Sequence, residues 1–397
     1  MRAGRRPLVL PAEAGRAEAR PSEINSAFDE FRAEYERYLA ANGQNEPIPD
    51  WLKVIAAPGV GAFFASKDRR SALVAATCYG ATLRAMAGAE AVEAFESLSD
   101  ADACEMEYWP LERRKIAAGL KATKPLDGKI ALVIGAASGI GRATAIRFAA
   151  EGAHVTLADL DLDGALSAAA EIDALSPERA QAIAADAADP AAMESAVREA
   201  VLRFGGLDVL FYSPGVPPQL HPVAEMTADE VRAQLSVHYE GAVAATRAAS
   251  QVMLAQACPE PGDSRSRRGG RLIYNASKAA FAPGEGAAAY GAAKAALVHY
   301  ARNAANELSR HGITANYINA DAIDTPLFRS IVKERAAHRG ETEEATLARY
   351  AERSLFRTAT VPPEAVADAA LWLASDASAY TSGCVITVGG GAEAMPR

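Results

Sequence analysis

The sequence Lys129-Ile-Ala-Leu-Val-Ile-Gly-Ala-Ala-Ser-Gly-Ile-Gly-Arg142 decides the fold of this chain. Its first part, Ile130–Ile134, is an apolar run without polar alternation, as is typical of a strand buried on both faces. Three glycines follow this strand: Gly135, Gly139 and Gly141. The pattern then becomes helical from about Arg142 to Glu151. A strand, a glycine-rich turn and a helix in this order bring backbone N–H groups and a helix N-terminus against a pyrophosphate, so the stretch predicts a dinucleotide site.

An acidic residue at the end of the next strand supports the same interpretation. Asp159 ends the predicted strand His154–Asp159, close to the roughly 20-residue spacing at which a carboxylate meets a ribose 2′-hydroxyl. The alternative is a plain tight turn, because a glycine triad alone is a weak indicator. The triad and the aspartate together favour the dinucleotide site.

Length and composition bound the remaining classes of function. With 397 residues the chain is long enough for two or three domains, and 50% hydrophobic residues can form a sizeable core. The net charge of −9, without a dense basic stripe interleaved with aromatics, argues against a nucleic-acid partner. No uncharged apolar run reaches the roughly 18 residues of a membrane span, so we also predict no membrane partner.

The cysteines are scattered singly along the chain. They are Cys78, Cys104, Cys258 and Cys384. Their spacing predicts neither a zinc site nor a disulfide framework, and it favours a protein of the reducing cytoplasm.

From Leu126 onward the chain alternates strand with helix, which predicts an α/β fold with a doubly wound, parallel, seven-stranded sheet of the Rossmann type. Strands are expected at Ile130–Ile134, His154–Asp159, Ala180–Ala185, Val209–Tyr212, Gly270–Tyr274, Thr314–Ile318 and Cys384–Val388. Helices are expected between them, for example at Met193–Phe204, Thr227–Gln256, Ala287–His311 and Pro363–Ser375. The segment Pro259–Gly270 is expected to be a surface loop. Residues 125–397 are therefore predicted to form one domain.

The residues able to do chemistry lie where strands end. Tyr290 and Lys294 are four positions apart, so a helix places them on one face about one turn apart. A phenol with a pKa of about 10 is a poor base at neutral pH, and a lysine ammonium beside it stabilises the phenolate. Ser277 follows the apolar strand Leu272–Tyr274, so its hydroxyl can reach a substrate oxygen. Hydride transfer to or from a carbonyl needs such donors on the developing alkoxide.

On its own, a tyrosine and a lysine at this spacing usually mark a solvated helix face. Here they follow a glycine loop, with a serine 13 residues upstream of the tyrosine, and this combination favours catalysis.

Together these residues resemble a short-chain dehydrogenase/reductase over essentially all of Leu126 to Gly391. The resemblance implies that Tyr290 is the general acid/base and that Ser277 orients the carbonyl. It implies that Lys294 holds the nicotinamide ribose and depresses the pKa of the tyrosine. It also implies NAD as the cofactor, because the 2′-phosphate of NADP would meet a like charge at Asp159.

The resemblance further implies a set of cofactor-binding residues. They are Gly135, Ser138, Gly139, Ile140, Gly141, Asp159, Asp186, Gly215, Tyr290, Lys294, Ile323 and Thr325. Within this set, Asp186 matches the family's adenine-contacting aspartate. Ile323 and Thr325 match the segment that contacts the nicotinamide carboxamide.

Several positions depart from the family pattern. Ile134 stands where a threonine usually precedes the first glycine. Tyr212-Ser-Pro-Gly215 replaces Asn-Asn-Ala-Gly, which removes amides that normally brace that strand end. Ala320-Asp321 replaces the Pro-Gly before the nicotinamide-contacting segment.

The fourth departure is His238, which corresponds to the helix asparagine that completes the catalytic tetrad through a bound water. A histidine can hydrogen-bond a water and a backbone carbonyl and so replace the asparagine, or it can fill space in an altered relay. Both interpretations stand. Because Ser277, Tyr290 and Lys294 are unchanged, we expect the chemistry to be retained.

Leu327 to Thr360 is the usual place for a substrate lid in this architecture. Its apolar residues that could cover a ligand are Phe328, Ile331, Leu347, Tyr350 and Leu355. For most of them, packing between the lid helices is the better interpretation.

The chain before the glycine loop is predicted to form a small α/β segment, residues 21–124. Helices are expected at Phe28–Leu39, Ser71–Met86 and near Ala91–Leu98, with two short strands around a Pro-Gly turn within Val54–Phe64. The arginine-rich residues 1–20 are either a targeting peptide or a disordered N-terminus, and we favour disorder.

This segment resembles the last part of a class II aldolase/adducin-type domain, as in bifunctional rhamnulose-phosphate aldolase/alcohol dehydrogenase proteins. The resemblance rests on Ala57-Pro-Gly-Val-Gly-Ala-Phe63, Ser66-Lys-Asp68, Phe95-Glu-Ser-Leu98 and Glu107-Tyr-Trp-Pro-Leu-Glu112. Aldolases of that family hold their metal with histidines located upstream of this region. The first histidine here is His154, so we predict no metal site and a structural or oligomerisation role.

The first functional hypothesis is an NAD(H)-dependent oxidoreductase acting on a small hydroxylated alcohol or aldehyde, which the resemblance makes lactaldehyde-like or sugar-derived. The alternative is a non-catalytic cofactor-binding or assembly protein that keeps the fold. The altered Ser213, Pro214 and His238 favour the alternative, whereas the unchanged catalytic set favours the enzyme. The resemblance also implies a homo-oligomer, either a tetramer or a dimer.

Overall fold

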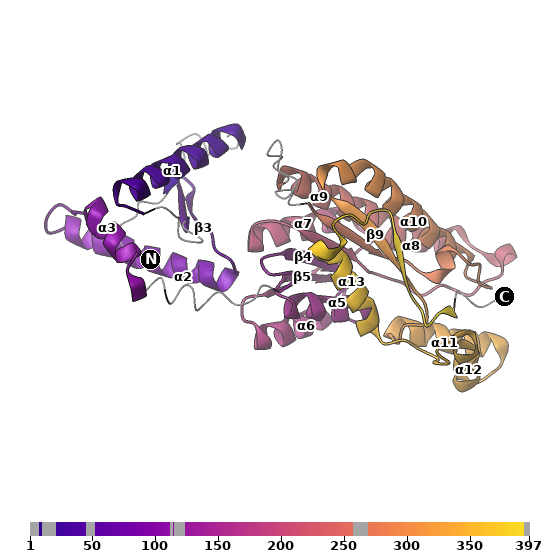
Figure 1. Ribbon diagram of the computed structural model, residues 1–397. Helices are drawn as coiled ribbons and strands as arrows, with labels where there is room; N and C mark the ends of the chain where they lie inside the picture. The colour runs from indigo at the N-terminus through magenta and orange to yellow at the C-terminus, as the bar shows by residue number, and fades with distance from the viewer. Residues whose placement is uncertain are drawn as a thin grey trace. The chain divides into compact units, whose positions relative to one another are not determined.

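A computed structural model describes residues 8–9, 21–44, 52–111, 114, 124–256 and 269–392. The chain divides into two compact units, Met1–Thr123 and Lys124–Arg397, which are described separately (Figure 1). Two predictions fall mainly outside the described residues: the state of residues 1–20 and the surface loop Pro259–Gly270, of which Gly269 and Gly270 are described. Cys258 also lies outside them. Within residues 1–20, Leu8–Val9 forms the short strand β1.

The described part of the first unit includes a small three-stranded sheet and the helices α1, α2 and α3. Strand β1 pairs in parallel with β2, and β2 pairs antiparallel with β3. The bounds are Val54–Ala57 for β2, Gly61–Phe64 for β3, Pro21–Ala41 for α1, Arg69–Glu90 for α2 and Asp100–Glu107 for α3. A small cluster of buried side chains from α1 and the region of α3 forms the main core of this unit, which includes Tyr35, Leu39, Cys104 and Tyr108.

The helix predicted near Ala91–Leu98 is wrong. Helix α2 ends at Glu90, and the next helix begins only at Asp100. Two side chains explain this, because the Glu90 carboxylate accepts the N–H of Phe95 and Ser99 caps α3 by accepting the N–H of Asp102. Between them Val92 is 89% exposed, so a helix there would gain little burial.

The second unit confirms the predicted doubly wound parallel sheet. Seven strands lie in the order β10-β9-β8-β7-β4-β5-β6, and every neighbouring pair is parallel. Their bounds are Ile130–Ile134 for β4, His154–Asp159 for β5, Ala180–Ala184 for β6, Val209–Tyr212 for β7, Arg271–Asn275 for β8, Thr314–Ala320 for β9 and Val385–Val388 for β10. Each strand starts and ends within two residues of its prediction.

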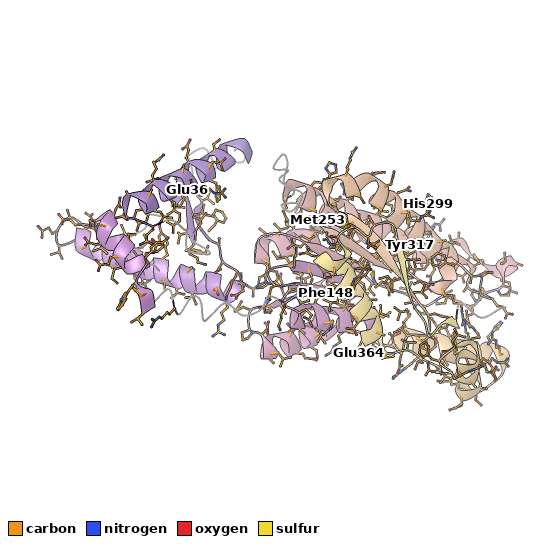
Figure 2. All side chains as sticks on the ribbon, viewed as in Figure 1. Glu36, Phe148, Met253, His299, Tyr317 and Glu364 are labelled. Carbon is orange, nitrogen blue, oxygen red and sulfur yellow. The ribbon has the colours of Figure 1, made fainter. Side chains whose placement is uncertain are left out.

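Helices cover both faces of this sheet (Figure 1). One face carries α5 (Gly139–Ala150), α6 (Leu162–Leu175) and α13 (Pro363–Ala374). The other carries α7 (Pro190–Phe204), α9 (Gly241–Gln256) and α10 (Ala288–Leu308). Phe148 of α5 and Met253 of α9 belong to the two separate cores that result (Figure 2). This two-sided burial explains why the strands are apolar runs without alternation.

The helix predicted at Thr227–Gln256 is interrupted. It consists of α8 (Ala228–Leu235), one π-helical turn at Ser236–Glu240, and α9. The π turn contains His238. Gly241 follows the turn at a position without room for a side chain, because a Cβ there would lie 2.0 Å from the carbonyl oxygen of Ala187. Single π turns inside helices are frequent at functional sites, so this irregularity points to the same region as the catalytic residues.

Two further helices, α11 (Pro326–Arg339) and α12 (Glu343–Arg353), occupy most of the predicted lid segment. Phe328, Val332 and Tyr350 form a small core between them. None of the described helices is long and apolar enough to cross a membrane.

Candidate active site

The glycine loop between β4 and α5 is packed too tightly for side chains. Gly135 has φ of +81°, and a Cβ there would lie 2.7 Å from the backbone of Ser213. A Cβ on Gly141 would lie 1.8 Å from the carbonyl oxygen of Gly135. Ser138 is the N-cap of α5, yet its side chain makes no capping hydrogen bond. The backbone N–H groups at the N-terminus of α5 are therefore not capped by the Ser138 side chain and are left for a ligand in the adjoining cavity.

This cavity, which we call the glycine groove, has a volume of about 540 Å³. Its lining includes Gly135, Ser138, Gly139, Ile140, Gly141, Asp159, Asp186, Gly215 and Thr325, all of them predicted cofactor-binding residues. The carboxylate of Asp159 accepts the N–H of Ala137 at 2.8 Å and that of Asp161 at 2.9 Å. Both oxygens are thereby fixed at the end of β5, with lone pairs left for further donors.

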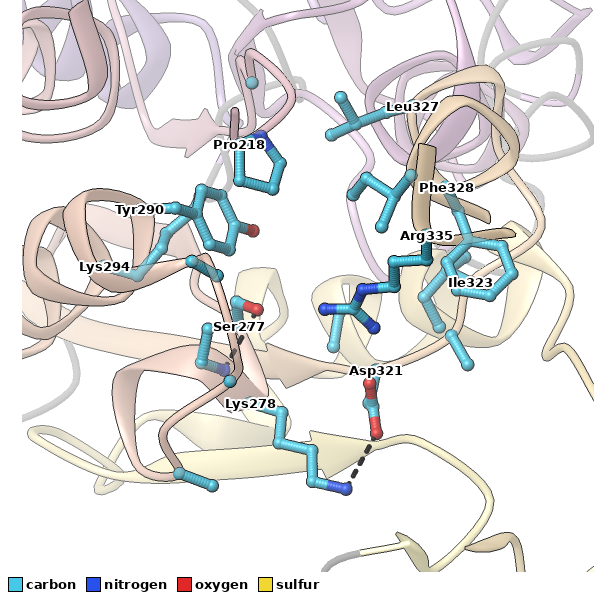
Figure 3. A pocket seen from close by; sticks show the side chains of 18 of the residues that line it. Pro218, Ser277, Lys278, Tyr290, Lys294, Asp321, Ile323, Leu327, Phe328 and Arg335 are labelled. Carbon is cyan, nitrogen blue, oxygen red and sulfur yellow. Dashed lines mark hydrogen bonds and ion pairs between the residues drawn. The ribbon is translucent and has the colours of Figure 1, made fainter. Parts of the chain in front are cut away.

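The predicted catalytic residues meet in a second cavity of about 510 Å³, which we call the catalytic cavity (Figure 3). Ser277 follows β8, and Tyr290 and Lys294 lie on α10. The buried Lys294 donates from Nζ to the carbonyl oxygen of Asn275 at 2.8 Å, and Nζ lies 5.9 Å from the centroid of the Tyr290 ring. The two cavities share lining residues, including Ile140 and Thr325, and so adjoin each other.

Burial and several neighbouring groups act on the pKa of the Tyr290 hydroxyl. Burial raises the pKa of the Tyr290 hydroxyl, and the charge of Asp321 raises it further. A hydrogen bond with Ser277 and the charge of Arg335 lower it. Burial lowers the pKa of Lys294 to about 7. That Lys294 depresses the pKa of the tyrosine stays a prediction.

His238 is fully buried in the π turn and stacks edge-on against Tyr290, with ring centroids 5.2 Å apart. Burial, and then the charge of Lys294, hold its pKa well below the ordinary range, so the imidazole is neutral. Backbone groups of Val216 and Pro214 lie near enough to oppose this shift. Neither makes a well-formed hydrogen bond, and both ring nitrogens lack a partner among the described residues. One neutral ring nitrogen can donate and the other can accept, which suits a water or a substrate oxygen.

The altered strand end at β7 is braced by other groups. The Tyr212 hydroxyl donates to the carbonyl oxygen of Val237 in the π turn, and the Asn275 amide donates to Ser213 Oγ at 3.0 Å. These bonds tie the ends of β7 and β8 and the turn that holds His238. They replace the bracing expected from the family's amides, so the altered residues do not leave this edge of the sheet unsupported.

Ile323 and Thr325 follow β9. Ile323 is buried and pairs with Val361, and it lines the catalytic cavity. Thr325 lines both cavities and caps α11 by accepting the N–H of Phe328 at 3.1 Å. Among the other lid residues, Phe328, Ile331 and Tyr350 line the catalytic cavity, Leu347 packs between the lid helices, and Leu355 is 53% exposed.

Six charged residues that line the catalytic cavity were not predicted as site residues: Lys278, Glu285, Asp321, Arg335, Arg339 and Arg353. Lys278 Nζ lies 3.1 Å from Asp321 Oδ2, and both side chains are largely buried. Arg353 of α12 also approaches Asp321, at 3.4 Å. The available signal was their position near strand ends: Lys278 comes three residues after β8 and Asp321 directly after the neighbouring β9. No group of three or more His, Cys, Asp or Glu side chains that could hold a metal occurs among the described residues.

Comparisons with known proteins agree with this geometry. Residues 135–393 match the family model described as enoyl-(acyl carrier protein) reductase, and residues 1–116 match that of the aldolase class II second domain. The uncharacterised oxidoreductase YuxG of Bacillus subtilis (strain 168) is 33% identical over 380 residues, which are 94% of this chain and 53% of that protein. The chain thus spans about half the length of this relative.

Two further proteins cover about two thirds of this chain and nearly all of their own length. L-rhamnose 1-dehydrogenase (NAD(P)(+)) of Sphingomonas sp. (strain SKA58) is 33% identical, over 68% of this chain and 97% of its own length. The crystal structure of sorbitol-6-phosphate 2-dehydrogenase from Erwinia amylovora superposes with a TM-score of 0.61 and 28% identity, covering 66% of this chain and 98% of that one.

Proposed function

The chain belongs to the short-chain dehydrogenase/reductase family, and from that premise we propose that it is an NAD(H)-dependent oxidoreductase of small hydroxylated alcohols or aldehydes. One observation carries the proposal. Ser277, Tyr290 and Lys294 line one cavity, and that cavity adjoins a groove lined by the glycine loop and Asp159.

The glycine groove supports a bound dinucleotide. Its shape depends on the absent Cβ atoms of Gly135 and Gly141, and the start of α5 is uncapped by a side chain. Ser138, Gly139 and Ile140 would contact the pyrophosphate, Asp159 the adenosine ribose, and Asp186 the adenine. Lys294, Ile323 and Thr325 would hold the nicotinamide end. When bound there, NAD(H) supplies the hydride acceptor or donor.

Asp159 supports NAD over NADP. Its carboxylate is held in place by the backbone N–H groups of Ala137 and Asp161, so it cannot swing away from a 2′-phosphate without losing both bonds. A phosphate at that position would meet the fixed negative charge.

The proton chemistry belongs to Tyr290. In reduction its hydroxyl donates a proton to the carbonyl oxygen, and in oxidation the phenolate accepts the alcohol proton. Ser277 hydrogen-bonds the same oxygen and limits where it can lie. Lys294, whose pKa burial lowers to about 7, is anchored beside the tyrosine by its hydrogen bond to the Asn275 carbonyl. His238, buried beside the Tyr290 ring, would hold the water or carbonyl that the family's asparagine holds.

The proposed substrate class rests on the volume of the catalytic cavity and on the compounds named in two relatives. A cavity of about 510 Å³ takes a short polyol or sugar derivative. L-rhamnose 1-dehydrogenase and sorbitol-6-phosphate 2-dehydrogenase bear such compounds in their names, so we propose a hydroxylated carbonyl compound of sugar or lactaldehyde type. We also propose a homo-oligomer, tetramer or dimer, which light scattering of the purified chain would test.

The direct test is oxidation of a panel of short polyols, sugars and hydroxy-aldehydes with NAD and NADP, followed by nicotinamide absorbance. We expect turnover with NAD of at least one panel member. Binding of NADH without turnover of any member would favour the alternative, a cofactor-binding or assembly protein that keeps the fold.

A further inference from the structure

Arg335 is one of several cationic residues that line the catalytic cavity, and its charge acts on the Tyr290 hydroxyl. It lies on α11, is half-buried, and lines the cavity with Ser277 and Tyr290. Figure 3 shows its guanidinium extending from the lid helix toward the space between Tyr290 and Asp321. Its Nη2 reaches the opposite wall, where a Cβ on Gly284 would lie 3.9 Å away. The side chain therefore spans the cavity.

The neighbouring acid does not neutralise this arginine. Asp321 is engaged by Lys278 at 3.1 Å and by Arg353 at 3.4 Å. Arg335 has no carboxylate within 4 Å among the described residues, and its one hydrogen-bond partner there is the Tyr350 hydroxyl. A guanidinium has five N–H donors in a planar fork, so most of them remain directed at the cavity.

Arg335 is also within electrostatic reach of the chemistry. Its charge acts on the Tyr290 hydroxyl, where it opposes the effects of burial and Asp321 on the pKa. A ligand group held by Arg335 would thus lie near the ligand oxygen that reacts at Tyr290. One short molecule could place its two ends at these two side chains. Tyr350 stabilises the arginine from the other side, with the guanidinium 5.8 Å from its ring centroid.

We propose that the substrate carries an anionic oxygen group, carboxylate or phosphate, and that Arg335 binds it opposite the carbon that Tyr290 serves. This rests on the proposed function and deepens it by naming the substrate class. A partly buried arginine without a counter-ion is costly, and a planar fork matches two anionic oxygens. A neutral polyol would leave that charge unpaired, so it is the poorer ligand.

The experiment compares matched ligands of one carbon skeleton: a neutral polyol, its terminal carboxylate and its terminal phosphate ester. Binding is measured by the ligand-induced shift in melting temperature, with and without NADH. We expect at least one anionic ligand to bind about tenfold or more tightly than the polyol. The carboxylate and phosphate arms identify which anion the site takes.

Variants assign the preference to this residue. Arg335→Met keeps an unbranched apolar side chain like the arginine stem but removes the guanidinium, so it should remove the anion preference, whereas Arg335→Lys should retain part of it. Arg349→Met is the matched control, because Arg349 is an exposed arginine of α12 that pairs with Glu341 and does not line the cavity. Unchanged NADH affinity in all three variants would show that they fold.

Equal binding of the three ligands, or no binding of any, overturns the proposal, as does an anion preference that survives Arg335→Met. Failure of the proposed function has a different signature. In that case NADH does not bind or no ligand is turned over, while the anion preference remains measurable without cofactor.

Discussion

The glycine groove and the catalytic cavity adjoin each other but are built differently. The groove is shaped by backbone, since a Cβ at Gly141 would lie 1.8 Å from a carbonyl oxygen. The catalytic cavity is shaped by long charged side chains on the lid and at strand ends, such as Lys278, Asp321 and Arg335. A backbone-built site tolerates almost no change, whereas a side-chain-built site can change its ligand by single substitutions. The groove therefore depends on glycines that cannot be replaced, whereas the cavity combines Ser277, Tyr290 and Lys294 with charged side chains that single substitutions can change.

The largest expected effect is on turnover, and it separates proton transfer in the catalytic cavity from cofactor binding in the glycine groove. Tyr290→Phe removes the proton donor and acceptor but keeps the ring that packs edge-on against His238. Turnover should fall by about 10³-fold, roughly 4 kcal/mol of transition-state stabilisation, while NADH affinity changes little. Steady-state kinetics and NADH titration measure the two quantities. Turnover within tenfold of the wild type would remove Tyr290 from the mechanism.

The next effect tests whether the groove is shaped by backbone. Gly141→Ala should abolish NADH binding and destabilise the second unit by about 3 kcal/mol, because the Cβ meets a fixed carbonyl. The matched control is Gly88→Ala on α2 of the first unit, where a Cβ meets nothing within 4 Å. That change should raise helix stability by up to about 1 kcal/mol. Thermal unfolding of both variants measures the two changes in stability. Equal changes would contradict the conclusion that the backbone shapes the glycine groove.

The pH dependence of stability tests the burial of Lys294. Its pKa is about 7 when folded and about 10.5 when unfolded, so between these values the unfolded state binds more protons. Wild-type stability should therefore rise between pH 7 and pH 9 by roughly 2 kcal/mol relative to Lys294→Met, with parallel curves below pH 7. Denaturant unfolding of the cofactor-free proteins measures the difference. Parallel curves over the whole range would mean that Lys294 is not desolvated.

The smallest expected effect concerns cofactor choice. Asp159→Ala removes the fixed carboxylate at the end of β5 and should reduce the preference for NADH over NADPH by about tenfold, or roughly 1.4 kcal/mol. Competitive titration with both cofactors measures the ratio. An unchanged ratio would assign the discrimination to another residue.

The contrast between the glycine groove and the catalytic cavity also explains which features the sequence could predict. The strands and the glycine loop follow from local patterns, because a fully buried strand such as Ile130–Ile134 must be apolar throughout. Tyr290 and Lys294 were found because helical spacing puts them on one face. The ion pair between Lys278 and Asp321 joins the ends of two strands 43 positions apart, and no periodicity encodes such a pairing.

Two other features lay beyond sequence patterns for physical reasons. The π turn at Ser236–Glu240 keeps the helical composition of its surroundings, so it does not disturb the apolar spacing. Arg335 resembles any exposed lid arginine until α11 is placed over the cavity. In the first unit, the predicted helix near Ala91–Leu98 failed because Ser99 and Glu90 offered the backbone other hydrogen bonds.

The most direct test is titration of the purified wild-type chain with NADH and with NADPH, followed by nicotinamide fluorescence. The glycine groove with its fixed Asp159 predicts tight binding of NADH and binding of NADPH weaker by about tenfold or more. Binding of neither cofactor, or tighter binding of NADPH, would contradict the assignment of the groove.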